Sequence, residues 1–153
     1  MEILRTTVPR LEELTRGVSQ RVLSTVTDYG WSVNDQLAHL RACHDVLGGN
    51  MLRIVREDHP AWKGMAPAAW QKQTDYFEWK FPPAFDAFRA QRVELLGVFE
   101  PMPPDAWQRT ATVTGMIGEH YENSALYYGA WMARHERSHL KHIARVIAEV
   151  GTR

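Results

Sequence analysis

Apolar residues recur at steps of three and four along most of the chain, which is the spacing of an amphipathic α-helix. The first such stretch follows Pro9, a residue that suits a first helical turn, and it ends at Tyr29-Gly30. Its apolar positions are Leu11, Leu14, Val18, Val22 and Val26. The pattern therefore predicts one long first helix between Pro9 and Tyr29.

A second helix is predicted from Ser32 to about residue 58. Ser32 offers an N-cap, and Asp35 three residues later completes a capping-box variant with the shorter acid. Its apolar stripe comprises Val33, Leu37, Leu40, His44, Leu47, Met51 and Ile54. Gly48 and Gly49 weaken the middle of this helix by about 1 kcal/mol each relative to alanine. We therefore expect close packing or a bend there.

Two further amphipathic stretches predict a third helix from about Pro83 to Phe99 and a fourth over roughly residues 119–150. Prolines at 101, 103 and 104 stop the third helix, and Gly151 is a plausible C-cap for the fourth. Only residues 110–114 have strand character, and that stretch is short. Four such helices, with no internal repeat, favour an all-α fold that is a four-helix bundle.

The connection between the second and third helices, residues 59–82, is long and rich in aromatic residues. It holds Trp62, Trp70, Tyr76, Phe77, Trp79 and Phe81 among prolines and charges. Such a crossover suits the wall of a pocket at one end of the bundle. A satellite hydrophobic cluster that only holds the connection down explains the same residues equally well.

Composition narrows the class of protein. The 153 residues suit a single domain spanning 1–153, and 18 basic residues balance 18 acidic ones, so the charge gives no attraction for nucleic acid or an anionic membrane. The single Cys43 excludes an internal disulfide, and the N-terminal residues lack a signal-peptide layout. No apolar run is long enough for a bilayer. We expect a soluble cytoplasmic protein.

The string His135-Glu-Arg-Ser-His139 carries the clearest chemistry. Two histidines four residues apart lie on one face of a helix, where both imidazoles can reach one metal ion. They also belong to the apolar stripe of the fourth helix, where a polar side chain needs a partner. His142 continues the stripe one turn further on, and we interpret it as a residue behind the ligands or in the core.

The third ligand must come from another helix. His39 and His44 lie on the second helix, His59 at its end and His120 near the start of the fourth. Antiparallel packing favours one of the two on the second helix, and His44 fits its apolar stripe better than His39. Cys43, one turn after His39, is a possible sulfur ligand, although a buried cysteine more often only packs. The spacing alone leaves these alternatives open.

Several short motifs together resemble the DinB/YfiT-like superfamily. Trp31-Ser-Val-Asn-Asp-Gln-Leu-Ala-His-Leu40 is similar to its helix-two signature, in which Trp-Ser precedes Leu-Ala-His-Leu. Ala133-Arg-His-Glu-Arg-Ser-His-Leu-Lys-His-Ile143 is similar to the second half of that signature. Phe88–Leu96 and the following Pro-Pro-Asp-Ala-Trp107 fit between them, so the resemblance spans most of the chain in order.

The resemblance implies a four-helix bundle that holds a divalent metal, zinc or nickel, through His39, His135 and His139. It also implies a homodimer. Many relatives have glutamine at the position of His142, which leaves a fourth-ligand role open. Water or a small-molecule substrate would take the remaining positions on the ion.

The literal H-E-x-x-H string is also the pattern of zinc proteases, but that interpretation fails. A third ligand must lie downstream, and the extended form of the motif would place it at Arg145. Glu149 lies on the same helix about 15 Å from His139. Glu136 points about 100° away from His135, which favours a surface salt bridge over a position behind the metal ligands.

The resemblance implies two classes of function. One is a metal-dependent enzyme, either a transferase that uses a low-molecular-weight thiol, which we favour, or a hydrolase. The other is a non-catalytic metal-binding protein of stress response or interaction. Arg92, a cation on the apolar face of the third helix, either binds an anionic substrate group or extends its charge to the bundle end.

Overall fold

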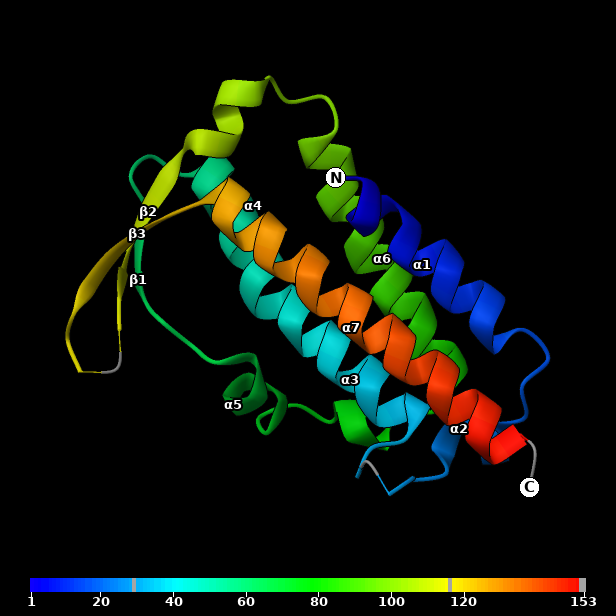
Figure 1. Cartoon of the computed structure of the whole chain (residues 1–153). Coiled ribbons are helices and arrows are strands. Elements are labelled where there is room, and N and C mark those ends of the chain that lie inside the picture. The colour runs from blue at the N-terminus through cyan, green and yellow to red at the C-terminus, as the bar shows by residue number, and fades with distance from the viewer. Residues whose placement is uncertain (29, 116, 152–153) are drawn as a thin grey trace.

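The computed structural model describes residues 1–28, 30–115 and 117–151, which form a helical bundle with a small sheet at one end (Figure 1). The helices are α1 (Glu2–Thr15), α2 (Gln20–Ser24), α3 (Val33–Cys43), α4 (Gly49–Arg56), α5 (Pro67–Gln71), α6 (Phe81–Phe99) and α7 (Ala125–Gly151). A π-helical turn, His44–Gly48, joins α3 to α4, and 3₁₀ turns occupy Tyr76–Glu78 and Pro104–Gln108. The strands are β1 (Ala61–Lys63), β2 (Thr110–Thr114) and β3 (His120–Ser124).

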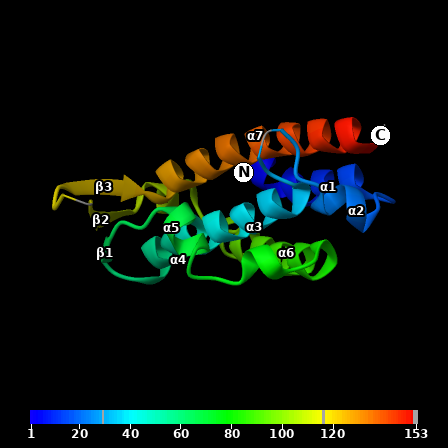
Figure 2. The same cartoon turned by 90° about the horizontal axis from the view of Figure 1, so that it is seen from below.

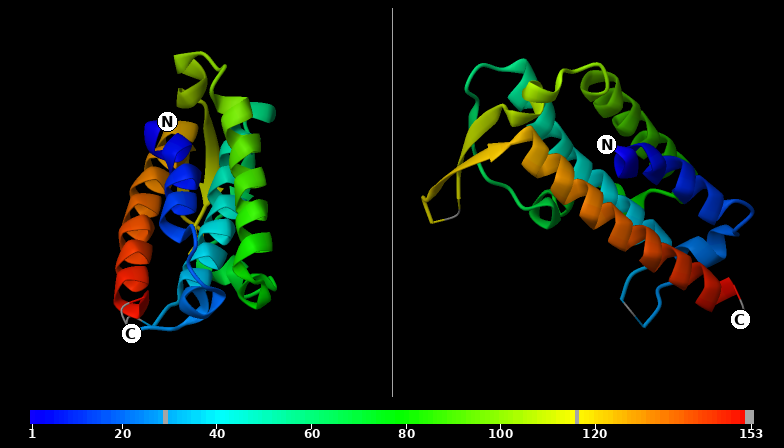
Figure 3. Two further views of the ribbon diagram at one scale, coloured as in Figure 1. Left: turned by 90° about the vertical axis from the view of Figure 1, so that its right-hand side faces the viewer. Right: turned by 45° about the horizontal axis from the view of Figure 1, so that its top comes forward.

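Two layers of long helices enclose the core. Seen from below, α1 and α7 form one layer, and α3 with α4 and α6 form the other (Figure 2). The helices within each layer run in the same direction, and the two layers run in opposite directions (Figure 3). Apolar side chains from both layers fill the space between them, for example Leu37, Phe88 and Ile143, all 0% exposed. The four-helix bundle is confirmed.

The prediction of one long first helix is wrong at both ends. α1 begins at Glu2 and contains Pro9 in its interior, and it ends at Thr15. Gly17 then adopts a φ of 73°, a left-handed conformation that breaks the helix, and α2 begins three residues later. The predicted stripe continues past this break, but Val26 lies beyond α2 and is 59% exposed. Tyr29 lies outside the described residues.

The second helix is confirmed, and its glycine pair marks the expected irregularity. Ser32 and Asp35 form a capping box at the start of α3. The backbone changes to a π-helical turn that ends at Gly48, directly before α4. A Cβ atom at Gly48 would lie 3.1 Å from Nε2 of His44, so the absence of a side chain lets the imidazole pack against the turn. Gly49 has no such neighbour.

The third helix is confirmed as α6, but the fourth begins later than predicted. Residues 120–124 form β3, which pairs antiparallel with β2, with Thr114 opposite His120. β1 pairs parallel with β2 on the other side. β2 is therefore the central strand, and its β-branched residues suit a strand that pairs on both sides. The sheet projects beyond the start of α7 (Figure 1). None of the described helices is long and apolar enough to cross a membrane.

Candidate metal centre

The three predicted ligands lie together where α3 packs against α7. His39 is on α3, and His135 and His139 occupy successive turns of α7. Nε2 of His135 lies 3.3 Å from Nε2 of His39 and 3.2 Å from Nε2 of His139. α3 and α7 pack against each other in opposite directions, which brings His39 to the middle turns of α7. Among the histidines that the spacing left open, His39 is the one that lies against His135.

Cys43 brings a sulfur atom to the same place. Its Sγ lies 3.4 Å from Nε2 of His39, one helical turn away on α3. His39, Cys43 and His135 form a group whose donor atoms all lie within 4.8 Å of one another, close enough to hold a metal ion. His139 is outside this group, and its Nε2 adjoins it through the 3.2 Å contact with Nε2 of His135.

These separations fit the coordination of a small divalent ion. Metal–nitrogen bonds of about 2.0–2.1 Å at tetrahedral angles set two ligand nitrogens about 3.3 Å apart. A metal–sulfur bond of about 2.3 Å sets nitrogen and sulfur about 3.5 Å apart. The observed distances of 3.2, 3.3 and 3.4 Å match both values.

Two glutamines orient the imidazoles. Nδ1 of His39 lies 3.1 Å from Oε1 of Gln71, and Nδ1 of His139 lies 3.3 Å from Oε1 of Gln36. A carbonyl oxygen only accepts, so each Nδ1 carries the proton and each Nε2 presents a lone pair to the cluster. A proton on Nε2 of His135 can be donated to one of these two lone pairs. The Cys43 thiol, 3.4 Å from Nε2 of His39, can donate to the other, and a cation among these atoms would take the place of both donors.

The imidazoles are half-buried, and this burial favours their neutral form at neutral pH. Burial lowers the pKa of His39. It lowers the pKa of His135 to about 4, with a smaller effect of His39, and that of His139 to about 3, with smaller effects of His135, His39 and His142. Burial also raises the pKa of the Cys43 thiol to about 12, helped by the charge of Glu136. Neutral imidazole is the form that binds metals.

Two tryptophans flank the cluster. The Trp131 ring stacks on His135 with centroids 4.6 Å apart, and the Trp31 ring meets His39 edge-on at 5.1 Å. The two rings and the three imidazoles are partly exposed. The cluster therefore lies at the edge of the core, between two tryptophan rings.

Hydrogen bonds and a cation–π contact hold the long connection between α4 and α6 against the bundle beside this cluster. Asp45 accepts hydrogen bonds from the Trp70 indole at 2.9 Å and the Tyr76 hydroxyl at 2.6 Å. The Arg41 guanidinium lies over the Tyr76 ring, 3.8 Å from its centroid. These contacts place Gln71, the neighbour of Trp70, against His39.

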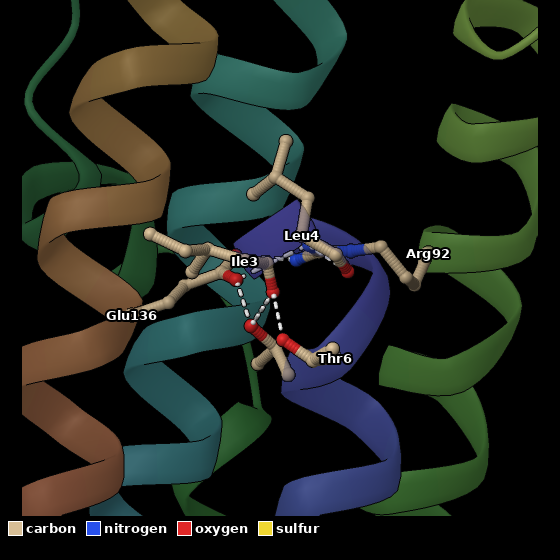
Figure 4. A network of polar contacts seen from close by, with 6 residues as sticks. Ile3, Leu4, Thr6, Arg92 and Glu136 are labelled. Carbon is tan, nitrogen blue, oxygen red and sulfur yellow. Dashed lines mark hydrogen bonds and ion pairs between the residues drawn. The ribbon is translucent and has the colours of Figure 1, made fainter. Parts of the chain in front are cut away.

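The expected salt bridge of Glu136 is present, but its surface location is wrong, and Arg92 does not extend its charge to the bundle end. Glu136 is not on the surface, because its carboxylate accepts hydrogen bonds from Arg92 inside the bundle. Arg92 neither reaches the bundle end nor has its charge free for a substrate. Its Nη1 also donates to the backbone oxygen of Leu4, and Thr7 donates to Glu136 at 2.6 Å (Figure 4). The 100° offset from His135 turns Glu136 toward α1 and α6 instead of toward solvent.

The remaining histidines lie apart from the cluster or beside it. His44 is buried against Gly48, and burial lowers its pKa to about 3, with a smaller effect of Arg92. His59 is exposed just before β1, and His120, predicted near the start of a helix, is exposed on β3. His142 is close enough to His139 to affect its pKa.

Sequence reasoning missed the two glutamines and the flanking role of the two tryptophans. Gln36 is one helical turn before His39 and adjoins Leu37 of the predicted stripe, and the structure shows that it is 0% exposed. Gln71 reaches His39 from a different segment, and no spacing in the sequence indicates that contact.

The helical bundle, the histidine cluster and the sequence motifs together point to one protein family. Residues 3–143 match the model of the DinB superfamily, and the chain belongs to that superfamily. The structure of YfiT from Bacillus subtilis, described as a probable metal-dependent hydrolase with an unusual four-helix bundle topology, matches with a TM-score of 0.76. The two are 16% identical, and the match covers 98% of this chain and 85% of YfiT, which shows a shared fold. No curated protein matches the sequence.

Proposed function

We propose that the protein is a divalent-metal-dependent enzyme in which His39, His135 and His139 hold a zinc or nickel ion. The observation that carries this proposal is the convergence of three Nε2 atoms at 3.2 and 3.3 Å, with Gln36 and Gln71 fixing the lone pairs of two of them. An ion bound there would lower the pKa of a coordinated thiol or water and so supply a nucleophile.

The surrounding residues favour a thiol over water as the nucleophile. Glu136, the acid of the H-E-x-x-H string, is engaged by Arg92 and Thr7 and is not available as a general base. A thiol needs less help to lose its proton than water does. Trp31 and Trp131 offer apolar surface to a small molecule beside the imidazoles. We therefore propose transfer of a low-molecular-weight thiol to an electrophilic substrate.

Hydrolysis is the second candidate, and the description of YfiT as a probable metal-dependent hydrolase favours it. The two candidates share the histidine cluster and differ in what enters it. A water molecule would take the position of the thiol, and an ester or amide that of the electrophile.

The test uses zinc- and nickel-loaded protein with two substrate panels, one of small thiols with an electrophilic aryl halide and one of activated esters. We expect conjugation that saturates with thiol and is lost in His135→Ala. His59→Ala, which removes an exposed imidazole outside the cluster, should keep full activity. Ester cleavage without conjugation would replace thiol transfer by hydrolysis. No turnover of either panel by metal-loaded protein would contradict an enzyme and favour a binding protein.

A further inference from the structure

Cys43 occupies a position that the three-histidine site does not require. Its side chain is 3% exposed, and it points from α3 into the gap where the imidazoles of α3 and α7 meet. The sulfur is 3.4 Å from Nε2 of His39, and it lies within 4.8 Å of the donor nitrogen of His135. Cys43 packs in the apolar core and also faces two imidazole nitrogens, which packing alone does not require.

We propose that Cys43 is a ligand of the ion, as a thiolate beside His39 and His135. This inference rests on the proposed metal site and adds a residue to it. The sulfur–nitrogen distance of 3.4 Å agrees with the edge of about 3.5 Å expected for zinc or a similar ion with one sulfur and one nitrogen ligand. The helix sets this distance, because residues four apart lie one above the other on one face.

The hydrogen bonds of the cluster allow the ion to replace the proton of the Cys43 thiol. Nδ1 of His39 donates to Gln71, so its Nε2 accepts and the Cys43 thiol is the donor at 3.4 Å. On binding, the S–H bond breaks, the proton leaves to solvent, and the electron pair of the sulfur goes to the ion. Gln71 keeps Nε2 of His39 unprotonated throughout.

Sulfur ligation has consequences for which ions bind and how. A thiolate favours zinc and other soft or borderline ions over magnesium or manganese. With His139 as a fourth donor, zinc would accept a substrate by expanding to five ligands. A thiolate ligand also makes metal retention sensitive to oxidation of Cys43.

The test is X-ray absorption of the zinc-loaded full chain, with optical spectra of the cobalt-loaded chain. We expect one sulfur neighbour at about 2.3 Å from zinc and a sulfur-to-cobalt charge-transfer band. Cys43→Ala and Cys43→Ser should lose the charge-transfer band and bind the ion at least about tenfold more weakly. Loss of a ligand should weaken binding at least as much as loss of a residue that hydrogen-bonds to a ligand. Thermal unfolding of the metal-free variants checks that they fold.

The outcomes separate this inference from the proposed function. A bound ion with only nitrogen and oxygen neighbours in the wild type would overturn the role of Cys43 and leave the three-histidine site standing. The wild-type absorption spectrum gives this answer even where a variant fails to fold. A wild-type protein that retains no zinc or cobalt would overturn both.

Discussion

Arg92 on α6 and Glu136 on α7 form an ion pair inside the bundle, where their side chains are 2% and 3% exposed. Arg92 also donates to the backbone oxygen of Leu4 (Figure 4), and Thr7 donates to Glu136, so the pair joins α1, α6 and α7. Glu136 stands where a zinc protease has its catalytic base. In this protein the same glutamate connects helices, while the two histidines beside it face α3.

Breaking this pair should destabilise the protein without emptying the cluster. Glu136→Gln leaves the Arg92 charge buried without its counter-ion, and we expect a loss of about 3–5 kcal/mol in the free energy of unfolding. Urea unfolding measures it. The double variant Arg92→Met/Glu136→Leu should recover most of the loss, because apolar side chains of similar size need no counter-ion. A loss below about 1 kcal/mol, the range of an exposed pair, would contradict the buried geometry.

The fold was largely predictable because most of its helices carry a continuous apolar stripe. α6 and the α3–α4 segment have such stripes and clear start or stop signals, and both were predicted correctly. The apolar stripe from Leu11 to Val26 led to the wrong prediction of one long helix. Its spacing continues across a break that depends on the left-handed conformation of Gly17. β3 was missed because His120–Ser124 is polar and becomes a strand only by pairing with β2.

The candidate site was predictable only in part. The spacing identified His135 and His139, and the family resemblance, not the periodicity, selected His39 over His44. The pairing of Arg92 with Glu136 depends on which helices are neighbours, and helix spacing alone does not determine that. The contact of Gln71 with His39 depends on the path of the long connection, so it could be found only in three dimensions.

The glycine pair between α3 and α4 provides a matched comparison. Gly49→Ala should stabilise the protein by up to about 1 kcal/mol, because no atom lies within 4 Å of the new Cβ and alanine favours a helix. Gly48→Ala should instead destabilise it by about 1–3 kcal/mol, because the new Cβ presses on the buried His44 ring. Urea unfolding of the two variants compares them directly. Equal gains in both would show that His44 does not constrain this turn.

Gln71 and Gln36 should control the tautomers of the imidazoles they contact. In Gln71→Leu, Nδ1 of His39 loses its acceptor, and we expect metal affinity to fall by about 10–100-fold. Nitrogen-15 NMR of the metal-free protein should show the proton of His39 moving from Nδ1 toward Nε2. Gln36→Leu should act in the same way on His139. Gln73→Leu, at an exposed position in the same connection, is the control and should change neither quantity.

Stability of the metal-free protein should fall as the pH is lowered through the ordinary range of histidine. The folded-state pKa is about 4 for His135 and about 3 for His139 and His44, against about 6.5 in the unfolded chain. The unfolded chain therefore binds more protons below pH about 6.5, and each group removes at most about 1.4 kcal/mol per pH unit. Above pH about 7 these three histidines do not make the free energy of unfolding depend on pH.

Urea unfolding of metal-free protein between pH about 7.5 and about 4.5 measures this effect. The slope should lessen in His139→Leu and stay unchanged in His59→Gln, whose side chain is 93% exposed. A free energy of unfolding that is constant or rises as the pH falls from about 6.5 to about 5 would show that these imidazoles are not held neutral by the fold.

Metal analysis of the purified protein, without chelators and after addition of zinc or nickel, tests the central claim most directly. We expect one divalent ion per chain in the wild type and in His59→Ala, and loss of that ion in His39→Ala, His135→Ala and His139→Ala, with each metal-free variant still folded. A wild-type protein that holds no ion in stoichiometric amount, or variants that all keep it, would contradict a metal site at these three histidines.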